Sequence, residues 1–448
     1  MNIVLSRFDK IILAFLGVVV VALGIILWRG DQVGAQITQT FPADGGEIGA
    51  TGKVGIEFKQ AMQQDQVSKL IKVKPEIPGH VVWSGNTLWY VFDAVLQPEI
   101  VYSFTLQAGG LAQDGRPILQ DHTINFQARS PEVIFLSSRP GQNELWIQAP
   151  GGGILRKLTF TGGKVYDYAA SPDGDHVVYS VTNSQGGSDL WIIQRDGSQN
   201  KLLVDCGADH CSQPAWSPDE AEIVYHRVVS AQNQNDAITG IWNVDPVSGQ
   251  TDFVISGEQP SWSPDGKWIA VMDPQAGIIR VLNVDQGKGI EVDASSDLAP
   301  VWIPKSTNMG YSNLQSAGAL STTALFRVDV TTNQVSRLLE NLPSDMELSM
   351  PAFTPDGLSY VISMRAFTSD LSKQLWYMPP GGKNLSQITK DQSYSNAHFS
   401  WDPWGTELVF QRVGMGVSNA SPQAMIWDRQ KNALQLLASD AALPSWLP

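Results

Sequence analysis

The sequence predicts an all-β protein: a small antiparallel sandwich and a seven-bladed β-propeller, preceded by one N-terminal transmembrane helix. Three observations predict this organisation. Short β-rich runs separated by turn residues fill the chain from about residue 36 onward. A proline-containing unit recurs about every 46 residues from residue 131 to the end. An uncharged apolar run of 18 residues, 11–28, lies near the N-terminus.

Composition excludes several classes of protein. The 448 residues carry a net charge of −14, and no basic cluster compensates for it. A protein that tracks nucleic-acid phosphates needs such a cluster, so we expect no nucleic-acid partner. Two cysteines are too few for a disulfide-dense scaffold or a four-cysteine zinc site.

The apolar run 11–28 just reaches the length that a membrane-crossing helix requires. Arg7 and Lys10 precede it, which favours a cytoplasmic tail, 1–10, and an external body. A cleaved signal peptide is the competing interpretation, with Val33-Gly34-Ala35 as its cleavage site. Both interpretations put residues 36–448 outside the cytoplasm. We expect the uncleaved anchor, and therefore a single-pass protein of the cell membrane with an extracytoplasmic C-terminal body.

Residues 36–129 read as a small domain of about seven short strands. Turn residues separate the β-rich runs 54–58, 70–73, 81–83, 88–92, 102–106 and 123–126. This density of strands predicts an antiparallel sandwich.

Several motifs in this segment resemble the SbsA-type bacterial Ig-like domain. They are Pro42-Ala43-Asp44-Gly45, Gly55-Ile56-Glu57-Phe58 with Ala61-Met62, Leu96-Gln97-Pro98 with Tyr102, Asp114-Gly115, and Asn125-Phe126. The resemblance covers nearly the whole segment. It implies an Ig-like sandwich that serves an exported surface protein as a spacer or adhesion module, and it carries no catalytic residues.

The repeat unit of residues 131–448 opens with an aromatic residue followed by Ser-Pro-Asp-Gly or a variant of it. Its prolines stand at 172, 218, 264, 304, 355, 403 and 448, in steps of 46, 46, 40, 51, 48 and 45 residues. Proline presets φ for a tight turn, aspartate bonds its own backbone, and glycine takes the position with positive φ. A period of 40–50 residues built from short strands is typical of propeller blades.

The two ends of the repeat complement each other. Residues 132–161 hold the second, third and fourth strands of a blade, whereas 444–448 is a first strand with nothing after it. Joined, they complete one blade and close the ring, which leaves no sheet edge open. Seven first strands then predict seven blades; six or eight would follow if a degenerate copy is misread.

The repeat resembles the Pro-Asp propeller repeats of the TolB-like family. Trp262-Ser263-Pro264-Asp265-Gly266-Lys267 with Ile269-Ala270 is close to the family consensus. The resemblance implies the fold but no particular function, because the motif residues are structural. The family includes periplasmic proteins and the propeller halves of prolyl-oligopeptidase-type peptidases.

The sequence shows no catalytic set. The Gly-x-Ser-x-Gly elbow of a serine hydrolase does not occur. His176, His226 and His398 fall at comparable places in different blades, which leaves a converging metal site open. Cys206 and Cys211 predict a short-loop disulfide in an exported chain, with a metal site beside Asp205, Asp209 and His210, or free thiols, as alternatives. We expect no cofactor, although calcium bound by acidic loops stays open.

We therefore expect a non-enzymatic binding or scaffold protein that captures a protein or another cell-surface ligand on its propeller. The polar segments 230–239 and 313–323 are the candidate contact loops. One alternative is a metal-assisted, carbohydrate-active or other propeller enzyme with its site in the central channel. Another is an extracellular sensor that signals through a membrane partner. Ten of the 15 tryptophans fall at two repeat positions, so they indicate blade packing rather than a binding surface.

Overall fold

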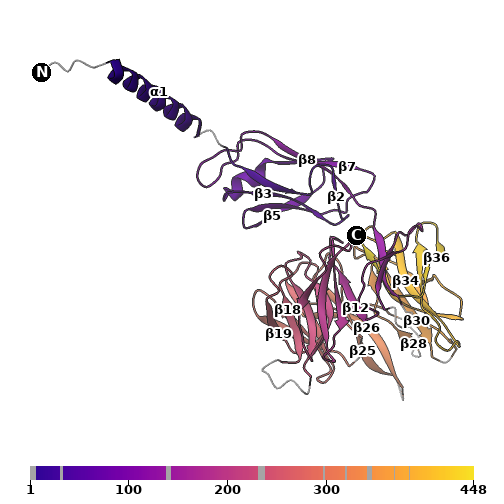
Figure 1. Ribbon diagram of the computed structural model, residues 1–448. Helices are drawn as coiled ribbons and strands as arrows, with labels where there is room; N and C mark the ends of the chain where they lie inside the picture. Colours follow the sequence, from indigo (N-terminus) through magenta and orange to yellow (C-terminus); the bar gives the residue numbers. More distant parts are fainter. Residues whose placement is uncertain are drawn as a thin grey trace. The chain divides into compact units, whose positions relative to one another are not determined.

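A computed structural model describes residues 7–30, 34–137, 143–230, 238–295, 298–317, 320–340, 346–367, 369–382 and 384–448. Side chains at 7, 9–11, 25–30, 315–317 and 320–322 also lie outside the description. The chain is nearly all β (Figure 1). It divides into two compact units, the first extending to Ile48 and over Gly52–Ala128, the second comprising Gly49–Thr51 and Arg129–Pro448.

The only long helix in the described part of the chain is α1 (Arg7–Gly30), which contains the predicted membrane segment 11–28. All described side chains from Ile12 to Gly24 are exposed, including Phe15 and Val18. Within the described residues, no helix meets the combined length and hydropathy of a membrane span. Some residues of these predictions lie outside the description. They are residues 1–6 of the predicted tail, the side chains of Ile11 and of residues 25–28, and Val33 of the alternative cleavage site.

The first unit contains two four-stranded sheets and one short helical segment. One sheet has the order β1 (Ile37–Phe41), β3 (Lys53–Phe58), β6 (Thr87–Phe92) and β5 (Gly79–Ser84). The other has the order β2 (Gly46–Ile48), β8 (His122–Ala128), β7 (Val101–Leu106) and β4 (Ile71–Lys74). The helical segment consists of α2 (Gln64–Val67) and the 3-10 turn η1 (Ser68–Leu70). Ile56, Leu88, Phe104 and Ile124 from both sheets share one buried core, which alternation along the strands predicts.

The second unit is a β-propeller. Its described residues form seven consecutive units of four strand positions, which we number as blades 1 to 7. Blade 1 comprises β37 (Ala441–Leu447), β9 (Glu132–Ser137), β10 (Leu145–Gln148) and β11 (Arg156–Lys157). Blades 2 to 4 comprise β12 (Val165–Ala170), β13 (His176–Thr182), β14 (Ser188–Gln194) and β15 (Lys201–Val204); β16 (His210–Trp216), β17 (Ile223–Val228), β18 (Gly240–Val244) and β19 (Thr251–Ile255); and β20 (Glu258–Trp262), β21 (Trp268–Asp273), β22 (Ile278–Asn283) and β23 (Lys288–Asp293).

Blades 5 to 7 follow the same plan, except that the first strand of blade 6 is split in two. They comprise β24 (Val301–Trp302), β25 (Asn308–Ala317), β26 (Leu320–Asp329) and β27 (Gln334–Arg337); β28 (Met346–Leu348) and β29 (Ala352–Phe353), β30 (Tyr360–Ala366), β31 (Gln374–Met378) and β32 (Ser386–Gln387); and β33 (Tyr394–Trp401), β34 (Glu407–Gly414), β35 (Gln423–Asp428) and β36 (Ala433–Ser439). The first strands of neighbouring blades contact one another, as β12 does β16 and β33 does β37, so they form an inner ring.

The Ser-Pro-Asp-Gly motif forms the turn from the first to the second strand of a blade. In blade 4, Ser263 Oγ donates to Asp265 Oδ1 at 2.6 Å and accepts the backbone N–H of Trp268 at 2.9 Å. The Gly266 N–H donates to the Ser263 carbonyl at 3.0 Å, at a φ of 69° that glycine adopts without strain. The same hydroxyl–carboxylate bond recurs at Ser171, Ser217 and Thr354. The repeated polar residues therefore hold turns.

Strand β37 closes the ring by pairing with β9. Ala441 lies opposite Ser137 and Leu447 opposite Glu132, in antiparallel register. Trp446 packs in a cluster with blade 7, whereas Leu447 packs in a cluster with blade 2. The Tyr168 hydroxyl of blade 2 lies within hydrogen-bond distance of the carbonyls of Ile134 and Leu443. Strand β37 thus pairs the end of the unit with its beginning and packs against blades 7 and 2 on either side.

One predicted contact loop is not a loop in the structure. The segment 313–323 belongs mostly to β25 and β26, which pair residue by residue from Asn308 opposite Asp329 to Ala317 opposite Leu320. Its threonine and serine residues are compatible with a strand, and pairing satisfies their backbone groups. Most of the other predicted loop, 231–237, lies outside the described residues, as do 318–319.

Replacing Trp446 with alanine tests the closure. Trp446 is only 5% exposed, so Trp446→Ala should lower the free energy of unfolding of the propeller by about 3–5 kcal/mol. Leu434→Ala on β36, where the side chain is 46% exposed, is the matched control and should cost less than about 1 kcal/mol. Urea unfolding of both variants measures the difference. Equal costs would contradict a closing role for β37.

Candidate functional site

The inner strands of blades 1, 3, 4 and 7 share one irregular backbone position. The register of the inner strand shifts there in β16, β20, β33 and β37. The residues in these bulges are Gln213, Gln259, His398 and Leu443, with φ between 47° and 53°. Bulges re-aim side chains and are common beside functional sites. The residue type at this bulge therefore varies between blades whose other strands are regular.

In blades 2 to 4 the bulge side chains connect neighbouring blades. The Gln213 N–H donates to Asp167 Oδ2 at 2.6 Å, and the Gln259 N–H donates to Gln213 Oε1 at 2.8 Å. Burial raises the pKa of Asp167, and the hydrogen bonds from the N–H groups of Gln213 and Tyr168 oppose that rise. These polar side chains serve blade-to-blade contacts rather than facing an open site.

Three of the repeated tryptophans of the first strands also connect blades by hydrogen bonds. The indole Nε1–H groups of Trp216, Trp302 and Trp401 donate to carbonyl oxygens of the preceding blade at 3.0–3.2 Å. The acceptors are Ala169, Ser261 and Ala352, which stand at equivalent positions. This agrees with the prediction that the tryptophan repeat reflects packing.

In blades 5 to 7 the inner ring borders a cavity of about 440 Å³. This volume falls in the range of small-ligand pockets. Aromatic and apolar side chains dominate its lining: Trp302, Phe353 and Phe399, with Val301, Pro304, Met350, Pro351, Ala352 and Ala397. The polar side chains of the lining are those of Ser349 and His398.

Ser349 and His398 differ in their hydrogen bonding. The Ser349 hydroxyl bonds to the Met350 carbonyl at 3.0 Å and to the Ser363 N–H at 3.0 Å. No described group bonds to the imidazole of His398. His398 is exposed, and partial desolvation lowers the pKa of its imidazole below the ordinary value. His398 therefore adds an exposed hydrogen-bonding side chain to a mostly apolar lining.

The structure places the three candidate histidines at unlike positions. His176 begins β13, His226 lies within β17 opposite Ser212, and His398 occupies the bulge of β33. Within the described residues, no group of three or more His, Cys, Asp or Glu side chains is arranged to hold a metal ion.

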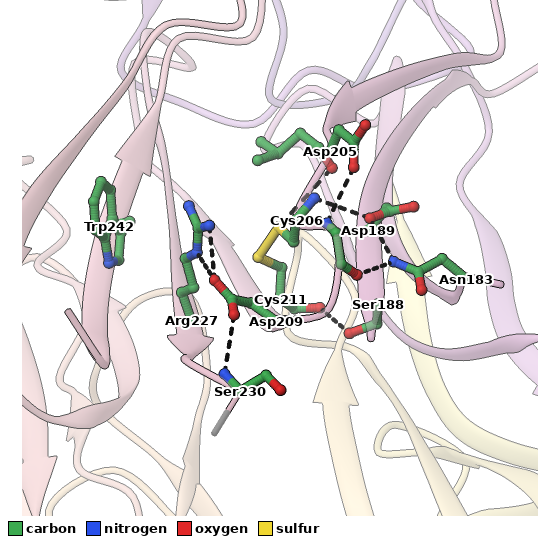
Figure 2. The surroundings of a disulfide bond; sticks show 12 residues. Asn183, Ser188, Asp189, Asp205, Cys206, Asp209, Cys211, Arg227, Ser230 and Trp242 are labelled. Carbon is green, nitrogen blue, oxygen red and sulfur yellow. Dashed lines mark hydrogen bonds and ion pairs between the residues drawn. A yellow bond between two sulfur atoms is a disulfide. The ribbon is translucent and has the colours of Figure 1, made fainter. Parts of the chain in front are cut away.

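A disulfide bond joins Cys206, in the loop between blades 2 and 3, to Cys211 in β16 (Figure 2). Both cysteines are buried. The Cys206 N–H donates to Asp189 Oδ1 at 2.9 Å, and the Cys211 carbonyl accepts the Ser188 hydroxyl at 3.0 Å. A single parallel residue pair, Ser188 and His210, continues the sheet from blade 2 to blade 3 at this point. The disulfide loop thus bridges two blades.

Asp209 of this loop, beside which a metal site was an alternative, is fully buried and ion-paired. Its Oδ2 accepts both Nε and Nη2 of Arg227, at 2.9 and 2.8 Å, and its Oδ1 accepts the Ser230 N–H at 2.9 Å. The Arg227 guanidinium lies 5.3 Å from the ring centroid of Trp242 (Figure 2). Asp205 is exposed and accepts the Gly207 N–H. These contacts tie the loop to blade 3.

Sequence reasoning missed the cavity beside His398. The bulge position precedes a proline in blades 3, 4 and 1, as Gln213-Pro214, Gln259-Pro260 and Leu443-Pro444. In blade 7 the proline is replaced, giving His398-Phe399. Aligning the repeats on this proline would have exposed His398 as one of two departures from the pattern, the other being Asp167-Tyr168 in blade 2.

The arrangement defines the class of the larger unit: it is a β-propeller closed by its C-terminal strand. No protein-family model matches the chain. A stretch of 143 residues is 24% identical to the uncharacterized protein YidR of Escherichia coli K12, covering 29% of this chain and a third, 33%, of YidR.

Solved propeller structures resemble the chain at low sequence identity. A prolyl endopeptidase matches 69% of this chain and 50% of its own length, with a TM-score of 0.52 and 13% identity. TolB of Acinetobacter baumannii matches 85% of this chain and 83% of its own, with a TM-score of 0.44 and 13% identity. Oligogalacturonate lyase of Vibrio parahaemolyticus matches 69% and 85%, with a TM-score of 0.49 and 11% identity. At these identities the likeness is one of fold.

Substituting Asp209 tests the disulfide loop. Asp209→Asn leaves Arg227 partly buried without its counter-charge, so we expect a loss of about 3 kcal/mol in the free energy of unfolding. Asp205→Asn, in the same loop but exposed, should change it by less than about 0.5 kcal/mol. Denaturant unfolding of both variants under oxidising conditions measures this. The ion pair is not important for stability if the two variants behave alike.

The buried His226 should make stability depend on pH. Burial lowers its pKa below the ordinary 6.5, although Glu258 opposes the shift. The unfolded chain therefore binds the proton more readily, and stability should fall as the pH drops below about 6.5. His226→Gln should flatten the change in melting temperature between pH 7.5 and 5.5. His210→Gln, at an exposed position, is the control. An unchanged slope in His226→Gln would contradict the assignment.

Proposed function

We propose that this protein is a membrane-anchored, externally displayed binding or scaffold protein whose propeller holds a ligand at the inner ring. The single observation that carries this proposal is the cavity of blades 5 to 7, whose mostly aromatic and apolar lining includes the exposed His398. Elsewhere the repeated polar side chains are used by the fold, in the Ser-Pro-Asp turns and the blade-to-blade bonds. A wall of this composition suits binding better than proton transfer or group transfer.

Two features support export to the cell surface. The exposed apolar side chains of α1 at all described positions from Ile12 to Val21 suit an apolar surrounding, because an all-round hydrophobic helix is normally buried. The disulfide between Cys206 and Cys211 suits an oxidising compartment. On this proposal 11–28 is an uncleaved anchor, and the first unit is an SbsA-type Ig-like spacer that separates the propeller from the membrane.

Charged substitutions in α1 test the anchor. Gly17→Arg with Val20→Arg should move the full-length protein out of the carbonate-resistant membrane fraction, since each arginine costs about 2.5–3.5 kcal/mol at the centre of a membrane helix. Ile154→Arg with Val247→Arg, at two exposed positions of the propeller, is the control. This double variant should stay in the carbonate-resistant membrane fraction. Added protease on intact cells should reach the propeller. A protein that stays membrane-bound in both variants, or resists protease, would refute the proposal.

Capture from membranes tests the binding role. Full-length protein is cross-linked in its native membrane, and the captured molecules are compared with those of Met350→Trp, which fills the cavity. A partner captured by the first and lost by the second supports binding at the inner ring. If the two sets are identical, the cavity is not the binding site.

A further inference from the structure

The outer strand of blade 7, β36, has one edge without a hydrogen-bonded neighbour. It is the last strand of its sheet and lies at the outer margin of the propeller (Figure 1). In the described part of the chain, β36 pairs only with β35. The backbone N–H and C=O groups along its other edge can therefore bond to a further strand.

The outer strands of the other blades carry features that prevent such pairing. Edge strands are commonly kept apart from other chains by charged side chains or by being very short. The outer strands of blades 1 to 5 each contain charged residues: Arg156 and Lys157 in β11, Lys201 in β15, Asp252 in β19, Lys288, Glu291 and Asp293 in β23, and Arg337 in β27. Strand β32 of blade 6 has only two residues. In contrast, β36 is seven residues long, ALQLLAS, and contains no charged residue.

Two exposed leucines make this edge apolar. Leu434 and Leu436 are 46% and 48% exposed. They lie opposite Trp427 and Met425 of β35, and directly opposed residues of an antiparallel pair share one face of the sheet. Trp427 and Met425 belong to the buried apolar cluster between blades 6 and 7. The two leucines thus extend that apolar face to the free edge of the sheet.

A second copy of the same strand complements this edge. Antiparallel pairing of two β36 strands, centred on Gln435, places Leu434 of each copy opposite Leu436 of the other. Lys431 precedes the strand and Asp440 follows it, so antiparallel pairing brings opposite charges together at both ends. Lys431 is 78% exposed, and its bond to Asp428 leaves it at the surface. The strand therefore supplies both the apolar and the charged complement of its own edge.

We propose that β36 is a self-association surface, through which two copies of this protein pair antiparallel and join their seventh blades into one continuous sheet. Pairing satisfies the free backbone groups of both edges and covers four exposed leucines. The contact is small for a specific interface, so the dimer forms at high protein concentration. This surface is separate from the cavity of blades 5 to 7, and the proposal does not depend on the binding role of that cavity.

Disulfide cross-linking tests the pairing. The two cysteines of the chain are already bonded to each other, so a single added cysteine is the only free thiol. The cysteine of Gln435→Cys lies opposite its own copy in the proposed dimer, within reach of a disulfide. A mild oxidant should therefore convert purified full-length Gln435→Cys to a species of twice the mass. Val335→Cys, at a 52% exposed position of β27, is the matched control and should stay monomeric.

Charge exchange tests whether the two strands face each other. Leu434→Lys with Leu436→Lys places like charges opposite each other and should weaken the dimer about tenfold in sedimentation equilibrium. Leu434→Glu with Leu436→Glu should do the same. An equimolar mixture of these two variants should dimerise again, since lysines then face glutamates. Leu202→Lys with Val335→Lys, on the outer strands of blades 2 and 5, adds the same charge and should leave the dimer unchanged.

Each outcome decides the proposal. A wild type that stays monomeric at every concentration overturns it, as does equal cross-linking of Gln435→Cys and Val335→Cys. A mixture of the lysine and glutamate variants that does not dimerise shows that the β36 strands do not pair with each other. Unchanged melting temperatures show that the variants are folded, so a loss of dimer reflects the strand edge. Capture of a partner at the cavity is measured separately, and its result stands whether or not β36 self-associates.

Discussion

Closure of the ring by β37 and β9 is the constraint on which the propeller depends. Each blade buries its two faces against its neighbours, so a single missing contact would expose a sheet edge and two apolar faces. Strand β37 prevents this with adjacent residues: Trp446 packs toward blade 7 and Leu447 toward blade 2. The strand comes from the end of the chain and β9 from the start of the unit. The fold is therefore complete only when the whole repeat array has been made.

Closure also explains why the repeated residues are unavailable for chemistry. Similar blades reuse the same turn, which the Ser-Pro-Asp carboxylates hold. At three junctions they also reuse the same inter-blade bond, from the indoles of Trp216, Trp302 and Trp401. The bulge of the inner strand is different, because the residue in it can change while the backbone of the inner strand keeps its contacts with the neighbouring blades. Asp167 and Gln213 use this freedom for blade contacts, and His398 uses it to face a cavity.

The sequence predicted much of the fold and little of the candidate site. The prolines from 172 to 448 predicted the period, the turns and the closing strand, because each depends on local backbone chemistry repeated at a fixed spacing. The segment 313–323 was expected to be a loop, since its polar residues resemble one; pairing across ten positions makes it two strands instead. The His398 cavity could not be predicted, because its wall joins residues from 301 to 399 that only the packing of three blades brings together.

By itself, the sequence determined the all-β class, the repeat and the acidic charge that sets this chain apart from nucleic-acid binders. These follow from composition and from patterns within a few residues, which act before the chain is folded. The tertiary structure alone decided which polar groups are committed and which are free. Asp209 became a buried ion pair, whereas His398 stayed exposed beside a mostly apolar lining, although both are single polar residues in the sequence. The reason is physical: burial and bonding partners depend on neighbours from other blades.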